Sequence, residues 1–165
     1  ADLFKKKSSK PMDRVKPILF FLVIVFITIQ FIRPARNQNG QVLQSGLFNT
    51  DSIPRNIHSI FLNACFDCHS NNTMYPWYFN VQPVGWMIAR DIENGKAKLN
   101  FNELSTLSSR RQVSKLQVIE NRIKDGTMPL PVYQFLHPSA RLTEGERRLL
   151  IDWIQKTKDT IASRR

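Results

Sequence analysis

The chain alternates between polar connections and segments in which apolar residues recur every three or four positions. That spacing places them on one face of an α-helix. Beyond residue 53 the helical segments are residues 54–64, 84–94, 109–125 and the stretch that begins at Thr143. No stretch alternates apolar and polar residues one by one, as a half-buried strand would. The pattern therefore predicts an all-α domain.

Local signals set the ends of these helices. Pro54 suits the first position of a helix, where a missing N–H costs nothing. Gly95 is expected at a left-handed cap that stops the second helix, and Gly126 is expected to end the third. Thr143 and Glu146 have the spacing of a capping box, which predicts the start of the last helix.

The longest apolar run is Ile18 to Ile32, fifteen residues with two polar interruptions. It is shorter than the ~18–20 residues expected for a spanning helix, and its length also fits the core of a signal peptide. Arg33 follows it, without a small-residue cleavage site, which favours an uncleaved transmembrane anchor over residues 17–32. The basic residues of segment 1–16 would keep that end in the cytoplasm. The sequence thus predicts a single-pass inner-membrane protein with its domain in the periplasm.

Residues 33–53 are rich in Asn, Gln, Ser and Gly and are expected to be a linker. A flexible tether and a segment laid along a partner both fit this composition. The remaining residues, 54–161, form the predicted domain.

The chain is basic, with a formal net charge of +11, and the part beyond residue 32 keeps +7. This balance suits an acidic protein partner or an anionic membrane surface, and it also fits ordinary solubility. No nucleic-acid-binding motif is present, so nucleic acid is not an expected partner.

The most specific motif is Cys65-Phe66-Asp67-Cys68-His69, the attachment pattern of a c-type haem. Both thiols can add to vinyl groups of one porphyrin, while the next imidazole reaches the iron. These are the only two cysteines. A redox dithiol, a disulfide and a zinc site are the alternatives. Zinc would need four ligands, with His58 or His137 added to the motif.

A second candidate ligand lies in Gly126-Thr127-Met128-Pro129. A methionine on a loop after a helix suits the sixth position of a haem iron, where its thioether raises the reduction potential. Met128 follows His69 by 59 residues, enough chain to wrap the porphyrin and return on its other face. The competing candidates are Met74, Met87, His58 and His137. An open or bis-histidine iron, with Met128 in the core, remains the alternative.

Three other side chains are candidates for contact with a porphyrin. Tyr75 and Trp77 lie in a dense aromatic loop that either walls the ring, with a hydrogen bond to a propionate, or fills the core. Arg90 is a candidate for pairing with a propionate, although a solvated arginine is equally ordinary.

Residues 54–157 resemble the small haem-binding domain of bacterial monohaem c-type cytochromes. The matching stretches are Cys65-x-x-Cys68-His69-Ser70-Asn71, Tyr75-Pro76-Trp77-Tyr78, Pro83-Val84-x-Trp86, Gly95-Lys96 with Leu99-Asn100-Phe101, Gly126-x-Met128-Pro129, Tyr133 with His137-Pro138, and Leu142-Thr143-x-x-Glu146 with Trp153. The resemblance implies a cytochrome c-like helical fold around one covalent haem c. It also implies His69 as the proximal ligand and Met128 as the distal one.

The expected function is electron transfer by a carrier that is not itself an enzyme. The expected partners are inner-membrane lipid and a membrane redox complex, such as a quinol-oxidising complex, a terminal oxidase or a photosynthetic reaction centre. The alternative to a free carrier is a subunit of such a complex. A haem-based ligand sensor and a structural haem subunit are the alternatives. Peroxidases that resemble c-type cytochromes usually carry two haems, whereas this chain has one attachment motif.

Overall fold

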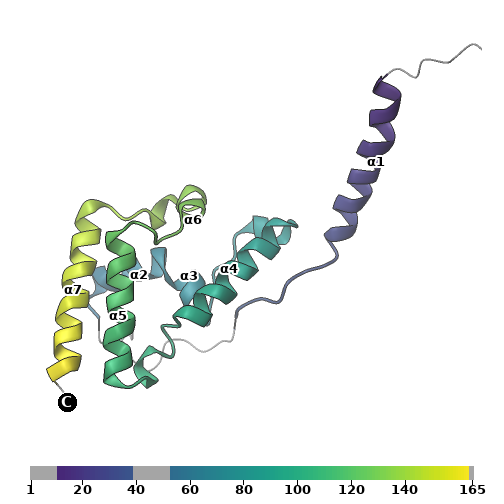
Figure 1. Cartoon of the computed structure of the whole chain (residues 1–165). Coiled ribbons are helices and arrows are strands. Elements are labelled where there is room, and N and C mark those ends of the chain that lie inside the picture. Colours follow the sequence, from purple (N-terminus) through teal and green to yellow (C-terminus); the bar gives the residue numbers. More distant parts are fainter. Residues whose placement is uncertain (1–10, 39–52, 164–165) are drawn as a thin grey trace, which may run out of the picture. The chain divides into compact units, whose positions relative to one another are not determined.

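The computed structural model describes residues 11–38 and 53–163, which contain seven α-helices and no β-strand (Figure 1). The helices are α1 (Pro11–Ile29), α2 (Arg55–Ala64), α3 (Phe66–His69), α4 (Val84–Lys98), α5 (Ser109–Lys124), α6 (Pro131–Leu136) and α7 (Glu144–Ser163), with short 3-10 helices η1 (Trp77–Asn80), η2 (Leu104–Thr106) and η3 (Pro138–Ala140). The predicted all-α class is confirmed. Two compact units are present, one of residues up to 35 with 76–89, the other of residues 36–75 with 90 onward.

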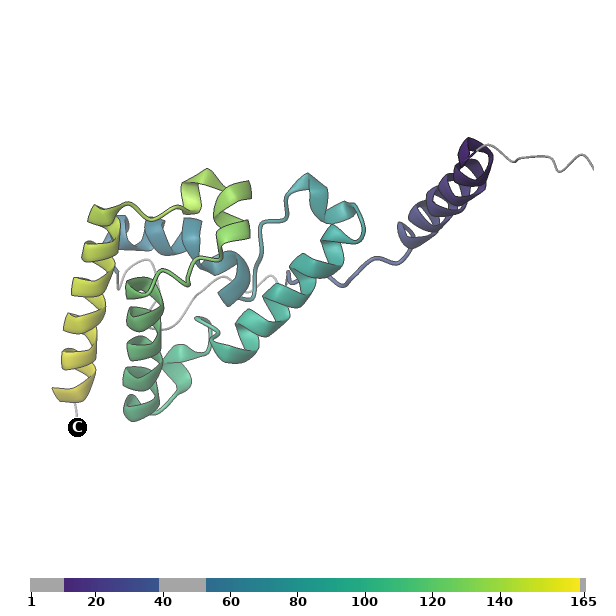
Figure 2. The same ribbon diagram turned by 45° about the horizontal axis from the view of Figure 1, so that its top comes forward.

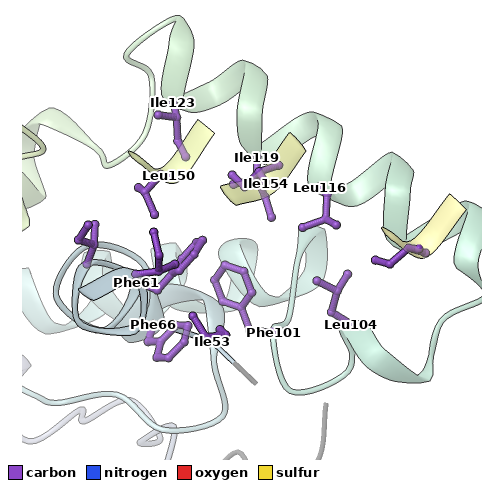
Figure 3. Packing of buried hydrophobic residues seen from close by; sticks show 13 residues of the cluster. Ile53, Phe61, Phe66, Phe101, Leu104, Leu116, Ile119, Ile123, Leu150 and Ile154 are labelled. Atoms are coloured by element: carbon purple, nitrogen blue, oxygen red, sulfur yellow. The ribbon is translucent and has the colours of Figure 1, made fainter. Parts of the chain in front are cut away.

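The larger unit is built on α5 and α7, which pack along their length, with α2 crossing α7 (Figures 1 and 2). Its interior is a cluster of aliphatic and aromatic side chains from these helices and from α3, η2 and the segments at Ile53 and Phe101 (Figure 3). Phe61 is fully buried and contacts the rings of Phe66, Phe101 and Trp153 at centroid distances of 6.2, 5.5 and 5.7 Å. Each large side chain buried in this way contributes about 1.5–3 kcal/mol of transfer free energy. Trp153 of α7 thus packs against α2, the first helix of the domain.

Two helix boundaries lie where the sequence places them. Helix α5 ends at Lys124, and Gly126 has a φ of +69°, a conformation that costs glycine little. Helix α7 starts with the capping box: the Thr143 N–H donates to Glu146 Oε2 at 2.8 Å, and the Glu146 N–H donates to Thr143 Oγ1 at 3.2 Å. The structure confirms both predictions. Each could be made from the sequence because it depends on residues that lie close together in the chain.

The predicted end of the second helix is wrong. Helix α4 runs through Gly95 to Lys98, and the positive φ expected at Gly95 is absent, since Gly126 is the glycine with a positive φ among the described residues. Gly95 therefore does not cap the helix. Its role is to let α4 pack closely against the backbone of Cys68.

The prediction of a single-pass anchor over residues 17–32 is also wrong. Among the described residues, no helix is both long enough and apolar enough to cross a membrane. Helix α1 already starts at Pro11 and includes charged residues, and it ends at Ile29, before the end of the apolar run. Its part from Pro17 on spans about 20 Å at ~1.5 Å per residue, against a hydrocarbon core of about 30 Å. The predicted location, an inner-membrane anchor that carries a periplasmic domain, is therefore not supported. Residues 1–10 of the predicted basic segment and 39–52 of the predicted linker lie outside the described residues.

In the smaller unit, the chain after α1 is hydrogen-bonded to the segment that precedes α4. The side chain of Gln30 donates to the Gln82 carbonyl at 3.1 Å and accepts from the Gln82 N–H at 2.8 Å. The Trp86 indole N–H donates to the Ile32 carbonyl at 2.8 Å. These bonds satisfy the N–H and carbonyl of Gln82, which precedes α4, and the carbonyl of Ile32, which follows α1.

A buried carboxylate joins α5 to α7 in the larger unit. The side chain of Glu120 is 3 % exposed and accepts hydrogen bonds from Lys124, Lys158 and Gln155. Burial alone would raise its pKa, but these three donors outweigh burial and lower the pKa of Glu120 to about 2. The charged form is therefore the one that the folded protein stabilises.

We expect Glu120→Gln to lower the free energy of unfolding by roughly 1–3 kcal/mol at pH 7. The pKa is lower in the folded chain than the unfolded value of about 4.3, so this contribution is present above that value and is lost as the pH falls towards about 2. Denaturant unfolding at pH 7 and at pH 2.5 should show the difference between wild type and variant shrinking in acid. Glu144→Gln, at an exposed carboxylate, should have little effect at either pH. An unchanged difference at the two pH values would contradict the assignment.

Candidate functional site

The Cys65–His69 motif forms a tight helical turn between α2 and the loop that follows α3. The N–H groups of Cys68 and His69 both donate to the Cys65 carbonyl, at 3.3 and 3.0 Å. Helix α2 has its inner face in the core, so its C-terminal end carries the motif to a fixed place. Cys65, Cys68 and His69 all line one cavity as a result.

Two adjoining cavities of about 210 and 310 Å³ surround the motif. They share wall residues, which shows that they are neighbours: Ala64, Cys65, His69, Lys98, Met128 and Pro129. Met128, distant in sequence, thus lies in the same walls as His69, and Cys68 lines the smaller cavity. The structure brings all four predicted site residues together. Which of them bind a cofactor stays a prediction.

The orientation of His69 is set by a backbone acceptor. Its Nδ1 lies 2.9 Å from the Leu99 carbonyl, and since a carbonyl can only accept, Nδ1 carries the proton. Nε2 is then the nitrogen with a free lone pair. Burial lowers the pKa of His69, despite opposing hydrogen bonds, and so favours the neutral ring that metals bind. Phe101 supports the ring edge-on at a centroid distance of 6.0 Å.

The loop that presents the Leu99 carbonyl is itself fixed to the motif. The Phe101 N–H donates to the His69 carbonyl at 2.8 Å. The Asn71 N–H donates to Asn102 Oδ1 at 2.8 Å, and Asn100 Nδ2 donates to Asn71 Oδ1 at 2.9 Å. Outer partners of this kind hold a ligating histidine in one tautomer and one orientation.

The two cysteines are free, half-buried thiols. Burial, with a smaller effect of neighbouring negative charge, raises the pKa of both Cys65 and Cys68 to about 12. A reactive dithiol needs the opposite shift. Within the described residues no group of three or more His, Cys, Asp or Glu side chains is arranged to hold a metal ion. The dithiol and zinc alternatives therefore gain no support.

Met128 is placed by the turn that ends α5. The Met128 N–H donates to the Arg122 carbonyl at 3.2 Å, and Asp125 Oδ1 accepts from the N–H and hydroxyl of Thr127 at 3.0 and 2.6 Å. These bonds hold the loop on its upstream side, with the half-buried Met128 side chain in the walls of both cavities.

The competing candidate ligands lie elsewhere. Met74 and Met87 are 77 % and 62 % exposed. His58 contacts Phe66 edge-on at 5.8 Å, and His137 stacks on Tyr133 at 4.2 Å. None of these four side chains is among the described residues that line either cavity. The geometry therefore favours Met128 as the partner of His69.

The position of Gly95 in α4 is explained by the close approach of this helix to the Cys65–His69 motif. A Cβ built on it would lie 2.6 Å from the Cys68 carbonyl oxygen, closer than real Cβ atoms approach another atom. Helix α4 packs directly against the backbone of the motif at this point. From the sequence alone, a glycine that ends a helix cannot be told from one that allows close packing, because the element that packs against it is not known.

Asn37 has a structural role at the site that no sequence pattern indicated. Its Nδ2 donates to the Ser70 carbonyl and to Thr73 Oγ1 at 2.8 and 3.0 Å, and its carbonyl accepts from the Thr73 N–H at 3.0 Å. Its N–H donates to the Tyr75 hydroxyl at 2.7 Å, and Lys96 Nζ donates to its Oδ1 at 2.6 Å. An asparagine in a polar, linker-like stretch gives no local signal of such a role.

The aromatic loop differs from the expectation that it walls the cavities. The Tyr75 hydroxyl binds Asn37 and the Arg36 guanidinium lies 5.4 Å over the Tyr75 ring, while Trp77 is 79 % exposed. The aromatic side chains that do line the cavities are Tyr133 in the smaller and Phe101 in the larger.

The larger cavity combines an apolar interior with cations. Its apolar walls include Phe101, Val118 and Ile119, and Lys98, Lys115 and Arg122 also line it. A flat apolar ring that carries carboxylates at one edge suits such a lining, with a histidine and a thioether available for a metal. The donor set and the lining therefore fit a haem.

A family model described as a haem-binding domain matches residues 24–156, which include the motif, Asn37 and Met128. No curated protein and no solved structure matches the chain.

Proposed function

Because the chain belongs to the haem-binding domain family, we propose that the two adjoining cavities hold a single haem c, attached through Cys65 and Cys68. The observation that carries this proposal is the convergence of the Cys-x-x-Cys-His turn with Met128 in shared cavity walls. The raised pKa values of both thiols disfavour the thiolate that disulfide exchange requires.

Within this proposal His69 and Met128 would both hold the iron. His69 offers Nε2, because Nδ1 is bonded to Leu99, and Met128 offers a soft, neutral sulfur that raises the reduction potential. Lys98, Lys115 and Arg122 would pair with the propionates, since they line the larger cavity. The haem, when bound, supplies an iron that gains and loses one electron.

We infer that the protein transfers electrons and is not a catalyst. With His69 and Met128 both bound to the iron, no site would stay open for a substrate. Phe101, Val118 and Ile119 give the larger cavity an apolar lining, and the fixed loops around His69 and Met128 would limit rearrangement between redox states. The partner would be another redox protein, and the basic balance of the chain favours one with an acidic docking surface.

The test is to extract the full-length haem-loaded protein with acidified acetone and to weigh the intact polypeptide. We expect the colour to stay with the protein and the mass to rise by one haem. Colour that moves into the solvent, or an unchanged mass, would overturn covalent attachment. The reduced protein should also bind carbon monoxide slowly; immediate binding would favour a ligand sensor over an electron carrier.

A further inference from the structure

Helix α6 follows Met128 by three residues and has no buried residue. Its apolar side chains Val132 and Phe135 are 69 % and 75 % exposed. Burial in a core therefore does not hold this helix in place, and polar contacts have to do so. Downstream, η3 places the fully buried Ala140 in the larger unit.

The contact on the inner side of α6 is a hydrogen bond from the Tyr133 hydroxyl to Asp67 Oδ2 at 2.7 Å. Tyr133 is half-buried and lines the smaller cavity together with Met128 and His69. Its hydroxyl also lies 3.4 Å from the Asn63 carbonyl at the end of α2. The bond thus joins the segment after Met128 to the middle of the Cys-x-x-Cys-His turn.

Asp67 is a rigid acceptor. Its Oδ1 accepts from the Met74 N–H at 2.9 Å, and its carbonyl accepts from Thr73 Oγ1 at 2.6 Å. Thr73 is in turn bonded to Asn37. Because Asp67 is fixed on several sides, the bond to Tyr133 restrains α6 rather than the motif.

We propose that the Tyr133–Asp67 hydrogen bond is a latch that keeps Met128 at the sixth position of the iron, which makes Tyr133 a positioning residue. The inference rests on the function proposed above. The loop that carries Met128 is held upstream by the turn at Gly126 and downstream by this bond. Without the downstream restraint Met128 leaves the iron more often, and a small ligand can take its place.

The experiment uses the full-length haem-loaded protein and mixes its reduced form rapidly with carbon monoxide. For Tyr133→Phe we expect binding about five- to tenfold faster than for wild type, the factor that one lost hydrogen bond of ordinary strength allows. The weak long-wavelength band of a ferric methionine-ligated haem should also disappear at a lower temperature. Tyr75→Phe is the matched control, since it loses a hydroxyl bonded to Asn37 but leaves α6 untouched.

Both variants should lose similar thermal stability, and only Tyr133→Phe should change the rate of carbon monoxide binding. In an Asp67→Ala background, adding Tyr133→Phe should change the rate no further, because the bond is already absent. Equal rates for Tyr133→Phe and Tyr75→Phe would overturn the latch. A wild type that lacks the long-wavelength band and binds carbon monoxide at once would overturn the latch and Met128 ligation together, while covalent attachment is judged separately by acetone extraction.

Discussion

Met128→Ala is expected to remove the long-wavelength ferric band and to lower the reduction potential on the order of 0.1 V or more, because the thioether that stabilises the ferrous iron is lost. Carbon monoxide should then bind the reduced protein without delay. The covalent haem should remain, since Cys65 and Cys68 are unchanged. Optical redox titration and rapid mixing measure these effects.

Two further variants sharpen this prediction. Met87→Ala changes an exposed methionine and should leave the band and the potential unchanged. Met128→His should exclude carbon monoxide again while the band stays absent, because a second imidazole fills the position without sulfur. A band that survives in Met128→Ala would show that another residue is the ligand.

Gly95→Ala is expected to destabilise the protein and to lower its haem content. In a helix, alanine is favoured over glycine by about 1 kcal/mol, so propensity alone predicts a gain. The added Cβ would lie 2.6 Å from the Cys68 carbonyl oxygen, and backbone shifts of this kind cost about 1–3 kcal/mol. The cost of the clash should exceed the gain in helix propensity, so Gly95→Ala should be destabilising. The clash should also displace the turn that carries both cysteines.

Gly145→Ala is the matched control, because a Cβ on Gly145 meets no atom within 4 Å. Near the start of α7 it should be neutral or slightly stabilising. Thermal unfolding and haem absorbance per polypeptide compare the two variants. If both alanines raise the unfolding temperature alike, close packing of α4 on the motif is wrong.

The elements with local signals were predictable from the sequence. The capping box at Thr143 depends on residues three positions apart, and the turn at Gly126 depends on one glycine. The haem motif is likewise contiguous. The 59 residues from His69 to Met128 are enough chain to bring Met128 back to the same cavity. Periodicity alone therefore gave the all-α class and the core faces of α2, α5 and α7.

Two of the misses involve partners that are distant in the chain. Gly95 resembles a helix stop until Cys68 is placed beside it. The apolar run extends from residue 18 to residue 32, but α1 ends at Ile29, so the last three residues of the run lie beyond the helix. Tyr133 entered only through a family resemblance, and its bond to Asp67 spans 66 residues. No pattern within one segment reports such contacts.

The hydrogen bonds of Asn37 have a practical consequence for anyone who wishes to trim the chain. A fragment that starts at Pro54 would contain both cysteines, His69 and Met128, yet it would leave the carbonyl of Ser70 and the hydroxyl of Thr73 without their amide donor. The smallest autonomous fragment that retains the attachment loop in its native shape should therefore start no later than Arg36.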